Sequence, residues 1–316
     1  AFSWLALHDT TENYRKIREL VVGYHKQYGD EVTFIPGAYF ANAYNTREQV
    51  NQDLHDGLQR VSEIVGDGYR PKSVVAGFLA ADNQKYLAEE EDVHVCQGTI
   101  WSQYAIDNQD GDGSISYPYY PSTEHFCKPA QGKEDFIDCV TLDGWSMDYL
   151  AARRQGFAEG FNSRMGVGPI ETLRAYGPEI GLKEMMHTTA INFDKGFGLI
   201  WRKAYKENSF DYRFVEQGSG IGGSDKDKEI RWYMNKDFRL ATLHNIDIKD
   251  APVYVIDFTR YDLPAQEPQG VPSPEKPIRN WSLINVMNQK GLRPQDKPKL
   301  LKELSVEDQA LIKKHY

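Results

Sequence analysis

The sequence has few cysteines, no long apolar run and no excess of basic charge. Its 316 residues include only three cysteines, Cys96, Cys127 and Cys139, which are too few for a disulfide scaffold. Cys127 and Cys139 could pair across a loop, but the odd count leaves at least one free thiol. No apolar run approaches the ~18 residues that a transmembrane helix needs. The net charge of −9, without a basic stripe, argues against nucleic acid as a partner.

Two common sequence signatures are also missing. No GxGxxG or phosphate-binding loop pattern follows an expected strand, which disfavours nucleotide binding. No GxSxG is present, so a serine hydrolase of that type is not expected. The chain opens on AFSWLAL, with neither a Met nor a charged leader. A removed secretion signal would fit this opening, and we expect a secreted or periplasmic protein rather than a cytoplasmic one.

Aromatic residues are abundant, with 19 Tyr, 14 Phe and 6 Trp. Many lie in segments rich in Gly, Pro and Asn, such as YPYY at 117–120, rather than in apolar runs. Rings with an apolar face and a polar edge suit sugar binding. Packing within loops is the alternative explanation.

Strand and helix patterns alternate through the first half of the chain. We expect strands within 2–7, 31–40, 72–80, 93–101 and 138–148, and helices over 13–28, 46–65 and 82–91. Thr46 is a plausible N-cap, with Gln49 three residues later. Buried strands separated by helices predict a parallel sheet, and four or more such units favour a (β/α) barrel.

The second half is less regular, and it ends in a strand pattern over 252–262. A Pro-rich connector and a charged helical tail follow. We therefore predict an α/β fold: an irregular, TIM-like (β/α) barrel over 1–262, with an extension over 263–316 packed on it.

Polar side chains follow most of the expected strands, and a barrel builds its active site at these strand ends. Carboxylates there can donate a proton, accept one or attack, while aromatic faces hold a sugar ring. The candidate catalytic residues are Asp9, Asp107, Asp143 and Asp257. The candidate substrate-binding residues are His8, Trp101, Gln103, Tyr119, Tyr120, His125, Trp145 and Arg260.

His8 and Asp9 form a pair directly after the first expected strand. Such a pair can ligate a metal or work as an acid/base couple, and an N-capping Asp beside a packed His is the alternative. A metal would need a third ligand, for which His125 and His187 are the plausible donors.

The stretch NQDGDGSIS, residues 108–116, matches the first half of a calcium loop. Tyr119 occupies the twelfth position, which needs a Glu, and no helix pattern flanks the stretch, so an EF-hand is rejected. A weaker metal site built from Asn108, Asp110 and Asp112 remains open, as does a solvated turn. The favoured interpretation is an active-site loop whose carboxylates and Tyr rings face a polyol.

The segment FSWLALHDTTENYRKIRELVVGYHKQYGDEVTFIPG resembles the opening of polysaccharide deacetylase barrels. It has the same order of features: a strand that ends in an acidic residue, then a helix that ends in KQYG, then a strand that contains VTF. The likeness covers about residues 1–150. The whole chain resembles an uncharacterised bacterial family of TIM-like barrels grouped with carbohydrate-active proteins.

That resemblance implies a divalent metal, with Asp9 in the place of one of the family's two carboxylates. Zn would suit such a site, and Ca would suit the stretch of Asn108, Asp110 and Asp112. The chain departs from the family pattern at two places. The family has two consecutive Asp where this chain has His8-Asp9, and LAADNQKYLAEE (79–90) lacks the family's pair of metal-binding His.

These observations together predict a carbohydrate-active hydrolase that acts on a glycan or another polyol by carboxylate acid/base catalysis. A sugar-binding barrel without catalysis and a metal-dependent amide or ester hydrolase are the alternatives.

Overall fold

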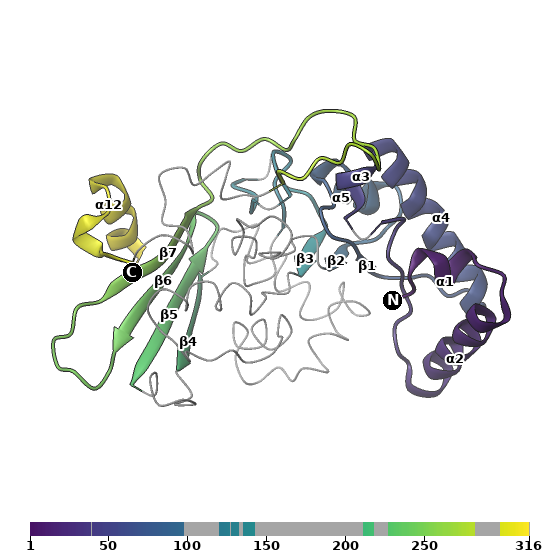
Figure 1. Ribbon diagram of the computed structural model, residues 1–316, viewed down its shortest axis with the longest axis horizontal. Helices are drawn as coiled ribbons and strands as arrows, with labels where there is room; N and C mark the ends of the chain where they lie inside the picture. The colour runs from purple at the N-terminus through teal and green to yellow at the C-terminus, as the bar shows by residue number, and fades with distance from the viewer. Residues whose placement is uncertain are drawn as a thin grey trace.

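The computed structural model describes residues 1–38, 40–97, 120–126, 128–132, 135–142, 211–217, 227–281 and 298–315. Helices α1 to α5 lie beside and above the short strands β1 to β3, and an antiparallel sheet with helix α12 lies apart from them (Figure 1). Within the described residues, no helix is both long enough and apolar enough to cross a membrane.

Short parallel strands form the centre of the N-terminal part. The strands are β1 (Val74–Val75), β2 (Val95–Gln97) and β3 (Val140–Leu142), and they pair in that order. Two contacts extend the order toward the N-terminus: Phe2 forms a parallel bridge to Phe34, and the Val75 amide donates to the Phe34 carbonyl (3.3 Å). Each extended segment therefore lies beside the next one along the chain, as expected for successive β/α units.

Helices α2 (Glu12–Tyr28), α4 (Arg47–Val65) and α5 (Ala81–Glu89) confirm the three expected helices. The Thr46 hydroxyl accepts a hydrogen bond from the Gln49 amide (3.2 Å), which confirms the predicted cap of α4. The apolar face of α4 is buried, through Val50, Leu54, Leu58, Val61 and Val65. No residue of α2 is fully buried: Val21 and Val22 pack against the core, whereas Ile17, Leu20 and Tyr24 are exposed.

The expected first strand is wrong. Residues Trp4–His8 form a short helix, α1, and only Phe2 pairs as a strand would. The Ser3 side chain accepts from the Ala6 amide (3.2 Å), so Ser3 caps this helix. The run WLALH has no β-branched residue to favour an extended backbone, and the cap is sufficient to turn it into a helix.

The C-terminal part is a five-stranded antiparallel sheet in chain order. Its strands are β4 (Asp211–Gln217), β5 (Lys228–Asn235), β6 (Phe238–Asn245), β7 (Tyr254–Arg260) and β8 (Lys299–Leu300). The strand expected over 252–262 is confirmed as β7, but both of its partners, β6 and β8, run antiparallel to it. The hairpin of β5 and β6 was not expected, because a charged, Gly-rich stretch precedes β5.

Short helical segments complete the described chain. Helix α3 (Ala41–Tyr44) lies between the Phe34 segment and α4, and the 3-10 turn η1 (Leu301–Glu303) leads into α12 (Val306–His315). Ile312 of α12 is buried in a cluster with Phe238, Val255 and Phe258 of the sheet. The predicted helical tail is therefore confirmed.

The Pro-rich connector leaves β7 and crosses to the N-terminal part, where it passes over α3 and α5 (Figure 1). The Ile278 amide donates to the Ala43 carbonyl (2.8 Å), and Trp281 is only 2% exposed. We call residues 263–281 the strap, because this segment ties the C-terminal sheet to the parallel strands.

Candidate functional site

The carboxyl ends of the parallel strands lie under the strap. The Phe34 segment leads into α3, and β1 leads through residues 76–80 into α5. Phe78, in the second of these turns, has a φ of 48°, a left-handed backbone that a bulky residue rarely adopts. Strain of this kind is concentrated at functional sites, and this edge is where parallel α/β folds bind ligands.

Glu267 of the strap lies at the centre of this edge. Its Oε1 accepts from the Ala81 amide (2.7 Å) and the Phe126 amide (3.0 Å), and its Oε2 accepts from Arg47 Nη2 (2.9 Å). Its side chain is 5% exposed. One carboxylate therefore joins the strap, the start of α4, the start of α5 and the segment around residue 126.

Burial raises the pKa of Glu267 above its usual range, although the three hydrogen bonds oppose this shift. A raised carboxyl pKa is a property of a general acid. Both oxygens are already occupied by donors, however, and the group is shielded from solvent. We therefore interpret Glu267 as a residue that holds the edge together rather than one that reacts.

A cavity of about 190 Å³ lies beside Glu267. Asn42, Asn45, Thr46, Arg47 and Glu48 supply polar groups to its wall, and the strap and Trp281 supply apolar groups. The Arg47 guanidinium lies over the Trp281 ring at 5.9 Å and also faces Asp82 Oδ2 at 3.3 Å. A small cavity with several amide and charged groups can bind a polar molecule through directed hydrogen bonds.

A larger hollow of about 700 Å³ lies at the end of the antiparallel sheet, between Lys228, His244, Tyr254 and Glu303. It is distant in the fold from the carboxyl ends of the parallel strands. We place the candidate site at the smaller cavity, because Arg47 of its wall binds Glu267, which joins the strap to the start of α5.

His8 and Asp9 follow a helix and not a strand. His8 is exposed and its ring packs on Trp4, with ring centroids 4.4 Å apart. Asp9 Oδ1 accepts from the Thr11 amide (2.7 Å), and hydrogen bonding to the Thr11 side chain, with this amide bond, lowers the pKa of Asp9. Asp9 therefore stabilises the turn between α1 and α2, but Thr11 is the N-cap of α2, so the alternative of an N-capping Asp9 is wrong.

His125 is completely buried, and its ring stacks on Phe126 with centroids 5.1 Å apart. Burial lowers the pKa of His125 to about 3, and the nearby Lys128 adds to the effect. The imidazole is therefore neutral at pH 7. Tyr120 is also buried, against Phe136, and offers no face to a ligand in this structure.

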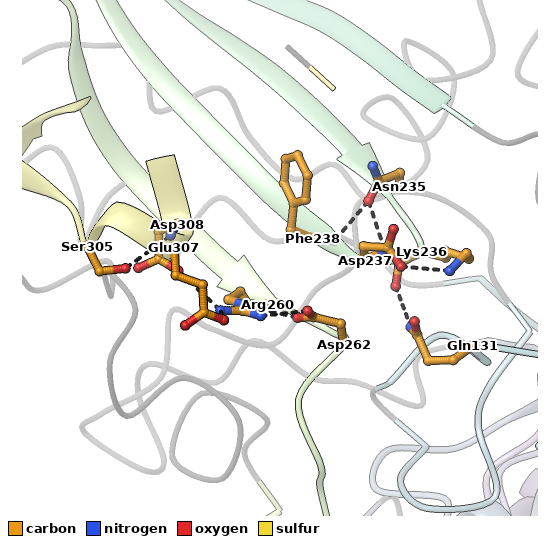
Figure 2. Close-up of polar contacts among 10 residues, drawn as sticks. All are labelled: Gln131, Asn235, Lys236, Asp237, Phe238, Arg260, Asp262, Ser305, Glu307 and Asp308. Atoms are coloured by element: carbon orange, nitrogen blue, oxygen red, sulfur yellow. Dashed lines mark hydrogen bonds and ion pairs between the residues drawn. The ribbon is translucent and has the colours of Figure 1, made fainter. Parts of the chain in front are cut away.

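Arg260 binds carboxylates of α12 and lines neither of the two cavities. Its guanidinium donates to both oxygens of Asp262 (2.9 and 2.6 Å), to Glu307 (2.7 Å) and to Asp308 (3.4 Å), as Figure 2 shows. These carboxylates raise its pKa further. Asp257 lies in β7, where its backbone pairs with Ala241, and its side chain lies outside the described part of the structure.

The remaining candidates lie outside the described residues. They are Trp101, Gln103, Asp107, Asn108, Asp110, Asp112, Tyr119, Asp143 and Trp145. One strand beside them is informative, because β3 is the VTL segment and ends at Leu142. Asp143 is thus the next residue after a parallel strand. Active-site residues of barrels occupy such positions, and this is why Asp143 is a candidate catalytic residue.

The described residues give little support to a metal centre. They contain no group of three His, Cys, Asp or Glu side chains that could hold an ion. His8 and Asp9 therefore lack a third ligand among the described residues, and the donor set that the deacetylase resemblance implies is not complete there.

Sequence reasoning missed Arg47, Glu267 and Trp281 as residues of this edge. Arg47 had one signal, since it follows a capping Thr at the start of a helix. Glu267 had none, because an acidic residue in a Pro-rich connector is normally solvated. Its partners Ala81 and Phe126 contribute backbone amides, which no residue pattern identifies.

Family models match almost the whole chain. Residues 1–199 and 195–234 match a domain of unknown function with a solved structure, DUF3863. The chain belongs to the DUF3863 family. Residues 239–316 match a second domain of that description, DUF3864. The DUF3863 match ends and the DUF3864 match begins at the hairpin of β5 and β6, so the antiparallel sheet contains strands from both domains.

One solved structure resembles this DUF3863 protein along its whole length. It is a protein from Parabacteroides distasonis described provisionally as a glycoside hydrolase/deacetylase, with 46% sequence identity and a TM-score of 0.77. The match covers 100% of this chain and 85% of the other. None of the curated proteins compared with the chain matches it.

Proposed function

We propose that the protein is a carbohydrate-active hydrolase whose site lies at the carboxyl edge of an irregular (β/α) barrel. The observation that carries this proposal is the 46% identity, over the full chain, with the relative described provisionally as a glycoside hydrolase/deacetylase. Parallel pairing in chain order, from Phe2 to β3, supports the barrel. A doubly wound sheet would instead reverse its strand order at a switch point.

Asp143 is the first candidate for the reacting carboxyl, because it follows β3 directly. Glycoside hydrolysis needs a second carboxyl about 5–5.5 Å away for retention of configuration, or about 6.5–9.5 Å away for inversion. Asp107 is our preferred partner, since it comes after β2, the strand next to β3. Asp9 is less suited, because it stabilises the turn before α2, and Asp257 belongs to a strand of the antiparallel sheet.

The activity test compares Asp143→Asn with the unmodified protein on a panel of acetylated and non-acetylated glycans. Release of reducing ends measures glycoside hydrolysis, and release of acetate measures deacetylation. We expect Asp143→Asn to lower the faster of these rates at least ~10²-fold, as loss of an acid/base group does.

Asp250→Asn is the matched control for this test. Asp250 is exposed with a φ of 60°, a conformation that Asn tolerates, so the variant should keep its full rate. Unchanged glycan turnover in a folded Asp143→Asn protein would remove the proposed role of Asp143. Saturable glycan binding without turnover would instead favour a sugar-binding barrel without catalysis.

A further inference from the structure

Two thiols meet inside the parallel sheet. Cys96 lies in β2, and Cys139 immediately precedes β3. Their Sγ atoms are 3.1 Å apart, and both side chains are completely buried. Carbon atoms in contact lie about 3.5–4.0 Å apart, so this is a close approach for two sulfur atoms that are not bonded.

The register of the two strands explains the approach. Cys96 is the partner of Thr141, and Cys139 precedes Thr141 by two positions. Cys139 lies just before β3, diagonal to Cys96 across the strand pair, and its amide donates to the Ile137 carbonyl (2.8 Å), so the chain approaches β2 here through a turn. Both cysteines belong to the same apolar cluster, together with Val74, Val93 and Ile137.

We propose that Cys96 and Cys139 are linked by a disulfide bond in the folded protein. The bond length of about 2.05 Å requires the two sulfur atoms to move about 1 Å closer than they lie in this structure. In the reaction, a disulfide of the thiol–disulfide exchange class is the oxidant. The Cys96 and Cys139 thiols lose two electrons and two protons, and the oxidant is reduced to two thiols.

The bond must form before the sheet closes over the two sulfur atoms. Burial raises the pKa of the Cys139 thiol, and its contact with Cys96 raises it further, so Cys139 is not a thiolate in the folded protein, and both sulfur atoms are buried. Exchange needs a thiolate and an accessible sulfur. The disulfide therefore forms during folding in an oxidising compartment, as expected for a protein exported from the cytoplasm.

The disulfide would link the two ends of the long segment between β2 and β3. Residues 97–138 lie between the two cysteines, and they include Asp107, Asn108, Asp110 and Asp112. Their anchor points would then be fixed covalently, beside the strand that leads to Asp143. Because Cys139 is bonded to Cys96 in this proposal, it cannot also pair with Cys127, which was the pairing that the sequence suggested.

Counting free thiols tests the proposal without an activity assay. The full chain, folded with a mixture of oxidised and reduced glutathione, is denatured in the presence of N-ethylmaleimide without reductant. Intact mass should show one maleimide, on Cys127, and three after prior reduction. Peptide mapping of the unreduced protein should find one linked pair, which contains Cys96 and Cys139.

Variants separate this pairing from the others. Cys127→Ser should keep the link and take up no maleimide, whereas Cys96→Ser and Cys139→Ser should each take up two. Three maleimides on the folded protein prepared with oxidised glutathione, or a linked peptide that contains Cys127, would overturn the proposal. Neither outcome bears on glycan hydrolysis.

Discussion

At the scale of single residues, the buried His125 makes stability depend on pH. Its folded pKa of about 3 lies below the ordinary value of 6.5. Between these values the unfolded chain binds a proton that the folded protein does not bind. The unfolding free energy therefore falls as the pH is lowered through this window.

We expect His125 to account for a loss of about 2 kcal/mol in the unfolding free energy between pH 7 and pH 5. Urea unfolding of the unmodified protein and His125→Gln over this range measures the difference. The variant should be less stable at pH 7 but should lose less stability on acidification. His8→Gln, at an exposed position, should retain the full pH dependence, and equal slopes for all three proteins would contradict the prediction.

Individual side chains also show which features can be predicted from the sequence and which cannot. Thr46 and its cap of α4 could be predicted, because the signal lies within four residues. His125 was expected to bind substrate, and its burial depends on residues distant in the chain, such as those of the strap. Burial of a single polar side chain is a property of tertiary structure that no local pattern encodes.

At the scale of elements, α4 packs closely against the Phe34 segment at Gly57. Any larger residue at position 57 would collide with the Phe34 ring. A Cβ added to Gly57 would lie 2.0 Å from a ring carbon of Phe34, and Phe34 is completely buried. Gly in a helix costs ~1 kcal/mol relative to Ala, so the close approach explains its presence here.

Gly57→Ala should lower the unfolding free energy by roughly 1–3 kcal/mol, because the ring and the helix must move apart. Gly23→Ala in α2 is the matched control: nothing lies within 4 Å of its added Cβ, so it should stabilise the protein by ~0.5–1 kcal/mol. Chemical denaturation measures both, and a stabilised Gly57→Ala protein would show that α4 is not packed in this way.

The elements predicted best are those with a long, regular pattern. Helices α2, α4 and α5 and strand β7 were identified from periodicity alone. Helix α1 was predicted to be a strand, because its four consecutive apolar residues fit either structure and its Ser3 cap is a weak signal. The antiparallel hairpin of β5 and β6 was missed because the charges around it resemble those of a loop.

At the scale of the molecule, Glu267 ties together segments that are distant in the sequence. It accepts from Arg47, Ala81 and Phe126, which lie between 141 and 220 residues before it. Glu267→Ala should lower the unfolding free energy by roughly 2–4 kcal/mol, because two buried amides and a partly buried guanidinium lose their acceptor.

Glu267→Gln keeps an acceptor oxygen and should cost less than Glu267→Ala. Glu275→Ala, at an exposed position of the same strap, should leave stability within about 0.5 kcal/mol. Thermal or urea unfolding of the three variants checks this order. Equal stability of Glu267→Ala and Glu275→Ala would mean that the strap does not depend on the buried carboxylate.

The buried position of Glu267 has a consequence for how the chain is made on the ribosome. When residues 1–142 have emerged, the start of α5 and the amide of Phe126 still lack their acceptor. That acceptor is synthesised more than a hundred residues later, so the N-terminal part cannot reach its final packing early in translation. A nascent chain arrested before Glu267 would expose the edge where we place the site, and a chaperone could bind there.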